Sequence, residues 1–225
     1  MTSEGPRVTL AIDTTVDRCA ISLRAPGRDL LLHGWQADRR LDSTIFAALA
    51  QALSGAGLAI GDVDRVIVNR GPGSFIGTRI GLAVANTFAT LLPLDVVGLD
   101  GFAVMARTVP EPRPERFFAA LNCVRREVFF QGFEDRAAGP APCGEREVLA
   151  FEAFLERVGA APVLLRATGL AHTLSDAELA ALGRRVPFDE TAFHEALHEI
   201  GGAAALPEAP ALAAPIYIKP ETDAA

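Results

Sequence analysis

A glycine-rich turn at residues 69–74, between two apolar segments, constrains the fold of this chain more than any other feature. The run 63–68 has the composition of a buried strand, and the segment after the turn has the apolar periodicity of a long helix. Gly71 and Gly73 allow backbone angles that other residues avoid, and Pro72 fixes the angle between them. Ser74 stands where the N-cap is expected. The pattern predicts a strand, a tight turn and a helix in succession.

The glycine-rich turn differs from the standard phosphate-binding loops. Bare N–H groups at a helix N-terminus can bind an anion. A P-loop, however, ends in Gly-Lys-Ser or Gly-Lys-Thr, whereas residues 77–79 are Gly-Thr-Arg, and the only lysine of the chain is Lys219. The glycines at 71, 73 and 77 also miss the dinucleotide-binding spacing by one residue. The sequence therefore predicts a distinctive turn that is not one of the standard nucleotide-binding loops.

Small side chains recur every fourth residue along the helix after the turn. Each interior glycine costs a helix about 1 kcal/mol, so the two glycines among them need a packing reason. That reason is either close packing inside the core of this chain or a helix-to-helix contact with another protein, and the sequence favours neither. The small stripe consists of Gly77, Gly81, Ala85 and Ala89, and an apolar stripe beside it consists of Ile80, Val84, Phe88 and Leu91.

The segment 71–83 resembles the signature of the bacterial TsaB family, Gly-Pro-Gly-Ser-Phe-x-Gly-x-Arg-Ile-Gly-Leu-Ala. Weaker likenesses follow the expected order at residues 10–15, 120–129 and 215–218. That family is the dimerisation subunit of the complex that places threonylcarbamoyl on the adenosine beside the tRNA anticodon. The resemblance implies an α/β fold of the actin-like, ribonuclease-H-like (ASKHA) class with two similar subdomains.

The resemblance also implies partners. The chain would be a non-catalytic subunit that dimerises with and activates the catalytic paralogue TsaD, recruits the small ATPase TsaE, and meets tRNA only through the complex. A homodimer is expected when the partner is absent. No cofactor is expected, because ATP or ADP binding would be weak or would depend on the complex. We predict a partner interface on the first two long helices, through Ile45, Leu49, Gly77, Ile80, Gly81, Val84, Ala85 and Phe88.

The composition is that of an ordinary globular protein. Half of the 225 residues are hydrophobic and 22% are charged, and polar residues interrupt the longest apolar stretches too often for a membrane span. The formal net charge of −7 disfavours a direct grip on nucleic-acid phosphates. The three cysteines lack a C-x-x-C pair, and the N-terminus lacks a signal pattern, so the cytoplasm is expected.

Turn residues divide the chain into short strands and helices. A helix capped by Asp42 or Ser43 should end at Gly57, and a strand is expected at 96–99. Before that helix, apolar runs separated by turn residues predict two hairpins, with strands at 8–12, 19–23 and 30–35.

Prolines at 110, 112 and 114 mark a boundary between two subdomains. We expect a ribonuclease-H-like subdomain at 1–108 that contains the glycine-rich turn, and a smaller one at 115–225. The second should begin with strands at 117–121 and 127–133, and its Ala/Pro-rich stretch at 203–214 should lead to a final strand.

An aspartate ends the first predicted strand, where actin-like ATPases hold a metal-bound phosphate. The turn after it, Asp13-Thr14-Thr15, lacks the usual glycine. The favoured interpretation is that Asp13 accepts hydrogen bonds from its own turn. The alternative is a weak or vestigial nucleotide site formed by Asp13, Thr14, Gly71, Gly73 and Ser74.

A literal His-Glu-x-x-His motif raises a competing hypothesis, an autonomous zinc metallopeptidase. On a helix, His194 and His198 lie one turn apart on one face, and Glu195 could act as the general base. The third histidine of the extended motif would be residue 204, which is an alanine. Zinc catalysis needs a third ligand and an open position, so we expect no metal here.

The favoured interpretation of this motif is an exposed amphipathic helix. Phe193 and Leu197 would face inward, and the two histidines would lie in solvent.

Two departures from the family pattern weaken the case for an independent enzyme. Leu41 and Asp42 stand where many members have His-Ser, and Asn122 stands where the family has an aspartate. Both changes remove groups that could do chemistry. A small actin-like phosphotransferase is a further alternative, and it would require tight nucleotide binding.

Overall fold

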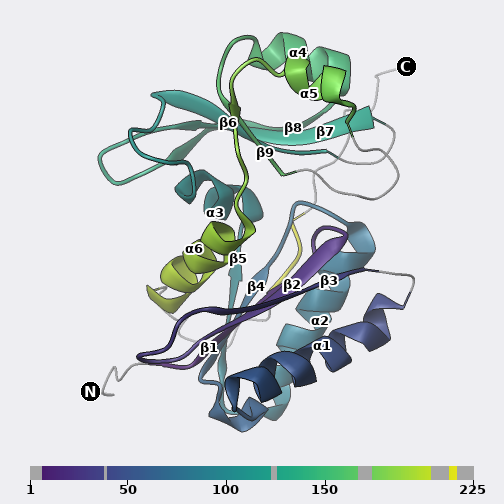
Figure 1. The fold of residues 1–225 in the computed structure, drawn as a ribbon, viewed down its shortest axis with the longest axis vertical. Helices are drawn as coiled ribbons and strands as arrows, with labels where there is room; N and C mark the ends of the chain where they lie inside the picture. The colour runs from purple at the N-terminus through teal and green to yellow at the C-terminus, as the bar shows by residue number, and fades with distance from the viewer. Residues whose placement is uncertain (1–6, 38–39, 123–125, 167–173, 204–212, 217–225) are drawn as a thin grey trace. The chain divides into compact units, whose positions relative to one another are not determined.

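The first part of the chain forms a five-stranded mixed sheet flanked by helices (Figure 1). The structure is a computed structural model that describes residues 7–37, 40–122, 126–166, 174–203 and 213–216. The strand order is β3-β2-β1-β4-β5, in which β1, β2 and β3 are antiparallel and β4 and β5 continue β1 in parallel. The elements are β1 (Thr9–Asp13), β2 (Arg18–Arg24), β3 (Leu31–Gln36), α1 (Leu41–Ala56), a 3-10 turn (Ile60–Asp62), β4 (Arg65–Asn69), α2 (Phe75–Leu91) and β5 (Asp95–Leu99).

The second part of the chain repeats this topology. Its sheet has the order β10-β9-β6-β7-β8, in which β6, β7 and β8 are antiparallel and β9 and β10 are parallel to β6. The repeat confirms the expected α/β fold with two similar subdomains. The elements are α3 (Gly101–Arg107), β6 (Arg116–Asn122), β7 (Glu127–Glu134), β8 (Ala141–Ala150), α4 (Phe151–Val158), β9 (Val163–Arg166), α5 (Asp176–Ala181), β10 (Arg185–Val186) and α6 (Glu190–Ala203).

The chain returns to its first unit near the C-terminus. The first unit comprises residues up to Asp100 together with Thr191–Ile216, and the second comprises Gly101–Glu190. These units differ from the expected ranges, 1–108 and 115–225, because α3 belongs to the second unit and most of α6 to the first. The prolines mark a real loop, but helix packing decides which residues form each unit.

Alternation along the strands gives the first sheet two different faces. Leu10 and Ile12 point to the face covered by α1 and α2, where they join a buried apolar cluster (Figure 1). Helix α6 covers the opposite face (Figure 1). There the hydroxyls of Thr9 and Ser22 contact histidine side chains of α6. One face is therefore a conventional apolar core, and the other combines polar side chains with apolar ones such as Ile67.

The helix boundaries follow local chemistry, with one exception. Gly57 ends α1 in the left-handed conformation with a φ of 64°, as expected. Helix α1 begins at Leu41, however, and its N-cap, Arg40, makes no side-chain capping hydrogen bond. Asp42 and Ser43 therefore lie inside the first turn and do not cap the helix. Among the described helices, none combines the length and the apolarity that a membrane crossing needs.

Candidate functional site: the outer face of helices α1 and α2

The β1–β2 turn packs directly against the start of α2. An added Cβ at Gly73 would collide with the Thr15 carbonyl oxygen, and one at Gly77 with the Thr14 carbonyl oxygen. At Gly81 the collision would be with Oγ1 of Thr14. That hydroxyl donates a 2.7 Å hydrogen bond to the Gly77 carbonyl. The glycines are therefore needed for close packing inside the first unit.

Hydrogen bonds within the turn region use many of its polar groups. Oδ1 of the buried Asp13 accepts from the backbone N–H and the hydroxyl of Thr15, at 3.0 and 2.7 Å, and from Nδ2 of Asn69 at 3.1 Å. The Ser74 N–H donates to the Thr15 carbonyl at 2.6 Å, and Oγ of Ser74 accepts from the Gly77 N–H at 3.1 Å. The predicted N-cap and the predicted Asp13 turn contact are thus both present.

The residues considered for a vestigial nucleotide site do lie near one another. Gly73 and Ser74 contact Thr15, which follows Thr14 and is held by Asp13. The N–H of Gly71, which has a φ of 96°, donates to the side chain of Asn69. These donors and acceptors bind one another. The N–H groups among them are therefore used within the turn region and do not form an open anion-binding site.

The small stripe of α2 faces the interior of the unit. This corrects the prediction that its glycines and alanines form the partner interface. Gly77 and Gly81 are buried against Thr14 of the β1–β2 turn. Ile45, Leu49, Val84 and Ala85 belong to the core beneath the helices. These side chains cannot contact another protein without unfolding the unit. Ile80 and Phe88 are half-buried at the edge of the same core. Of the two interpretations left open by the sequence, internal close packing is the one observed.

The opposite faces of α1 and α2 carry the exposed apolar groups of the described structure. Its four large exposed hydrophobic side chains all lie on these two helices, at 53–72% exposure. They are Phe46 on α1 and Phe75, Ile76 and Leu91 on α2. Helices α1 and α2 lie side by side on the same face of the sheet (Figure 1). We call the outward surface of these two helices the helical face.

The helical face is also poor in charge. Helix α1 contains one charged residue, Asp42, and α2 contains one, Arg79. The guanidinium of Arg79 lies over the Phe75 ring, 3.7 Å from its centroid. Between the large side chains, the exposed residues are mostly small, including Ala47, Ala50 and Ala83. A large apolar surface with few charges is typical of a protein interface.

Sequence reasoning missed most of the residues on the helical face. The small stripe marks one face of α2, but its spacing does not show whether that face packs on the sheet or on another protein. Contacts with the β1–β2 turn, which exist only in the folded chain, decide this.

The His-Glu-x-x-His motif has a different role from either interpretation in the sequence analysis. His194 and His198 are buried, at 0% and 3% exposure, and so the expectation that they lie in solvent was wrong. The Ser22 hydroxyl lies 2.7 Å from Nδ1 of His194 and 2.9 Å from Nε2 of His198, and the Thr9 hydroxyl lies 2.6 Å from Nδ1 of His198. Glu195 is exposed. Phe193 and Leu197 are buried as expected.

Burial governs the charge of this histidine pair. Desolvation lowers the pKa of His198 from its ordinary 6.5 to about 3, with smaller contributions from His194 and Arg24. His198 is therefore neutral at physiological pH. A neutral imidazole with both nitrogens within hydrogen-bond distance of hydroxyls is a structural group.

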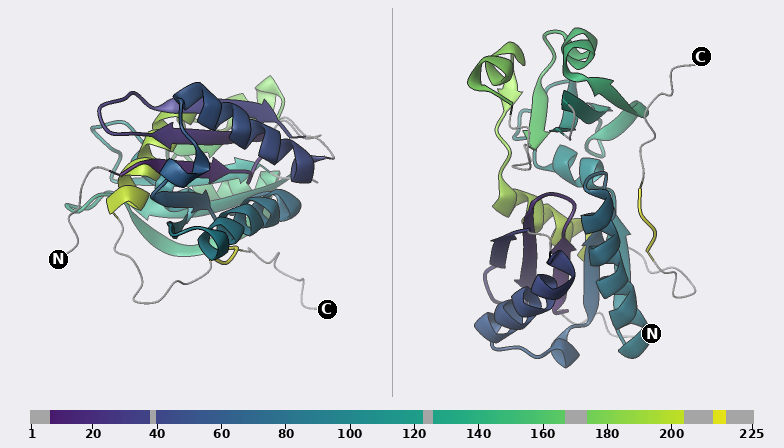
Figure 2. Two further views of the ribbon diagram at one scale, coloured as in Figure 1. Left: turned by 90° about the horizontal axis from the view of Figure 1, so that it is seen from below. Right: turned by 90° about the vertical axis from the view of Figure 1, so that its right-hand side faces the viewer.

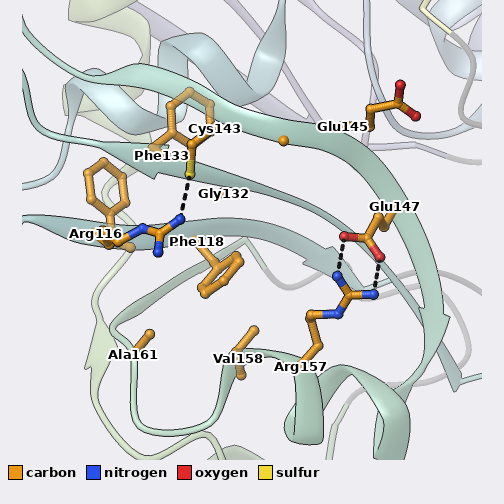
Figure 3. Close-up of a pocket in the computed structure, with 12 residues that line it drawn as sticks. Arg116, Phe118, Gly132, Phe133, Cys143, Glu145, Glu147, Arg157, Val158 and Ala161 are labelled. Carbon is orange, nitrogen blue, oxygen red and sulfur yellow. Dashed lines mark hydrogen bonds and ion pairs between the residues drawn. The ribbon is translucent and has the colours of Figure 1, made fainter.

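A cavity of about 420 Å³ lies on the second unit (Figure 3). Phe118 and Val158 line its apolar part, and Arg157 on its wall forms two contacts with Glu147, at 2.8 and 3.0 Å. Arg116 donates to the Cys143 sulfur at 3.8 Å, and this contact is the main cause of the raised pKa of Arg116. Two of the four charged side chains of this cavity, Arg157 and Glu147, pair with each other. We regard the helical face as the stronger candidate site because it gathers the large exposed apolar side chains.

A family model and two curated proteins match parts of this chain. The family model described as "TsaD: tRNA N6-adenosine threonylcarbamoyltransferase" matches residues 35–128, which include both α1 and α2. A Haemophilus influenzae protein named tRNA threonylcarbamoyladenosine biosynthesis protein TsaB is 30% identical over 54% of this chain and 51% of its own length. The Escherichia coli protein of that name is 28% identical over 56% of this chain and 54% of its own length. The chain thus spans about half the length of the curated relatives it matches.

Two solved structures match nearly the whole chain. Both are Pseudomonas aeruginosa proteins, one described as YeaZ and the other as an uncharacterized protein with similarity to the peptidase YeaZ. The YeaZ structure has a TM-score of 0.67 at 25% identity, over 94% of this chain and all of that chain. The other has a TM-score of 0.71 at 24% identity, over 95% of this chain and all of that chain.

The repeated sheets define the class of protein, an α/β protein of two similar subdomains, and the two Pseudomonas aeruginosa structures share this fold. Within that class, the curated relatives named TsaB and the matching TsaD-type model support the TsaB family for this chain.

Proposed function

We propose that this chain is a non-catalytic subunit in the biosynthesis of tRNA threonylcarbamoyladenosine. In this role it dimerises with, and activates, a catalytic paralogue that carries a TsaD-type domain. The names of its relatives support the pathway, and the TsaD-type match supports a partner built on a related domain. A net charge of −7 favours contact with tRNA through that partner and not through this chain.

The observation that carries the proposal is the concentration of exposed apolar side chains on the helical face. Phe46 and Ile76 are 56% and 68% exposed, and burying such groups against a partner is favourable. A partner with a related domain would offer two equivalent helices, so the contact would be a four-helix layer with approximate two-fold symmetry. An isolated chain would pair with a second copy through the same face.

The packing of the other candidate sites supports an accessory role. Asp13 is held by its own turn and by Asn69, and the two histidines of the zinc-like motif bind hydroxyls of the sheet. Asn122 stands in place of the family's aspartate. The recruitment of the small ATPase TsaE is part of the same proposal.

Pairing with the TsaD-type paralogue of the same organism tests the proposal. Ile76→Glu places a charge on the helical face, near the start of α2, at a position that the fold leaves exposed. We expect it to weaken pairing by at least about tenfold, measured by calorimetry, and to leave the unfolding temperature nearly unchanged. The matched control is Ala153→Glu, which adds the same charge to an exposed position on α4 and should pair normally.

Wild-type affinity of the Ile76→Glu variant would show that the helical face is not the interface. Failure of the unmodified chain to pair at all would contradict the accessory role itself.

A further inference from the structure

The described tail residues, 213–216, bind to the first unit as an extended peptide. They contact α2 and the segment that follows β4, and Figure 2 shows them running beside α2. Nδ2 of Asn86 donates to the Ala213 carbonyl, and the Ala213 N–H donates to Oδ1 of Asn86, both at 3.0 Å. One side-chain amide thus pairs with one backbone unit in the manner of a neighbouring strand.

Arg70 provides the second half of this contact. Its Nε donates to the Ala214 carbonyl at 2.5 Å, and its own carbonyl accepts from the Ile216 N–H at 2.8 Å. The N–H of Arg70 donates to the Leu99 carbonyl at 2.9 Å, beyond the last ladder pair of β4 and β5. Arg70 therefore extends the sheet by one residue and then binds the tail.

The floor of this groove selects a small side chain. Gly98 on β5 lies beneath Ala213, and an added Cβ there would lie 3.0 Å from the Cβ of Ala213 and would collide with the side chain of Arg70. Ala213 packs against the core cluster under α2. The glycine at position 98 thus leaves the space that the methyl group of Ala213 occupies.

The proline at position 215 fits the hydrogen-bonding pattern. The groove binds the N–H and carbonyl of Ala213, the carbonyl of Ala214 and the N–H of Ile216, so the N–H that Pro215 lacks is not required. A proline also restricts the residue before it to extended conformations. The tail is therefore pre-organised in its bound form, which lowers the entropy cost of binding.

We propose that Arg70, Asn86 and Gly98 form a peptide-binding site of which the C-terminal tail is the tethered occupant. The site accepts an extended segment with the order small residue, any residue, proline, and a residue with a free N–H. The occupant and the site belong to one chain, so binding is intramolecular, with an effective concentration on the order of millimolar. Because four residues form a small contact, a free peptide with the same pattern exchanges with the tail.

The test uses the full chain with a protease recognition site placed between residues 204 and 212. After the folded protein is cleaved, a fluorescent peptide with the sequence of residues 211–219 should bind it at least about tenfold more tightly than it binds the uncleaved protein, because the severed tail dissociates. Asn86→Ala should weaken this binding by about tenfold, since both amide contacts are lost. A peptide in which leucine replaces Ala213 should bind equally poorly.

Thr87→Ala is the matched control. Thr87 is the next residue of α2, and its hydroxyl donates to the Ala83 carbonyl within the helix, so this variant should bind the peptide normally. Equal binding to cleaved and uncleaved protein, or unchanged binding by the Asn86→Ala variant, would overturn the proposal.

Hydrogen exchange in the uncleaved protein provides a second measurement that needs no cleavage. Asn86→Ala should speed exchange of the Ala213 and Ile216 amides by about tenfold or more, whereas Thr87→Ala should not. Unchanged exchange in the Asn86→Ala variant would contradict the site independently of the peptide experiment.

Discussion

The hydroxyl of Ser22 lies 2.9 Å from Nε2 of His198, across the interface between β2 and α6. The same hydroxyl lies 2.7 Å from Nδ1 of His194. Nδ1 of His194 and Nε2 of His198 therefore both point to the hydroxyl oxygen of Ser22. A zinc ion bound between them would have to displace that side chain from a buried sheet position.

This relationship predicts that Ser22 is needed for stability. Ser22→Ala removes the shared hydroxyl, and His198 is left with a buried nitrogen that loses its partner. We expect a loss of about 1–3 kcal/mol in the free energy of unfolding, measured in urea. Ser43→Ala is the control, since Ser43 is exposed in the first turn of α1 and its loss should cost less than about 0.5 kcal/mol. Equal effects of the two substitutions would argue against the buried network.

The same network predicts a stability that declines in acid. Because the folded-state pKa of His198 is about 3 and its ordinary value is 6.5, the unfolded chain binds the extra proton between these values. The contribution of His198 is complete above its ordinary value of 6.5 and is lost as the pH falls towards about 3. Between pH 7 and pH 5 the loss from this group should be about 2 kcal/mol.

Urea titrations of the wild type and His198→Gln at several pH values check this expectation. The variant should be less stable at pH 7 but should show a shallower decline below it. An identical pH slope in both proteins would mean that His198 does not control acid stability.

Gly81 should tolerate no side chain while Thr14 is present. Although alanine favours a helix by about 1 kcal/mol, the added Cβ at this position meets Oγ1 of Thr14, and we expect Gly81→Ala to destabilise the protein by about 1–3 kcal/mol. Thr14→Ala should remove most of that penalty, because the remaining neighbours of the new Cβ are 3.6 Å away.

A double-mutant cycle on these two positions measures the coupling. Gly55→Ala on α1 is the control, because its Cβ would meet only Leu31 at 3.5 Å, and it should leave stability unchanged or raise it by up to about 1 kcal/mol. Additive effects of Gly81→Ala and Thr14→Ala would mean that the stripe does not pack on the β1–β2 turn.

Tight nucleotide binding by the isolated chain is not expected. The donors around Asp13 and Ser74 already bind the β1–β2 turn and Asn69, and residues 77–79 lack the lysine of a P-loop. Calorimetry with ATP and magnesium should detect no micromolar binding. A micromolar dissociation constant that Asp13→Asn abolishes would establish a functional site and reopen the phosphotransferase hypothesis.

Local features of this protein were predictable from sequence because they depend on neighbouring residues. Ser74 caps α2 and Gly57 ends α1 through contacts that span three or four residues. Apolar runs separated by turn residues placed the three antiparallel strands to within a few residues. Asp13 accepts from its own turn two residues later, so this contact too was visible in the sequence.

Only the tertiary structure shows which face of each helix is buried and which is exposed. The periodicity of α2 defines its small stripe, but only the contact with Thr14 of the β1–β2 turn shows that this stripe faces the interior of the unit. Likewise, the spacing of His194 and His198 places both on one helical face, and Ser22, 172 residues earlier than His194, decides that this face is buried. Contacts between distant residues depend on how elements pack, and a pattern within one element carries no information about its neighbour.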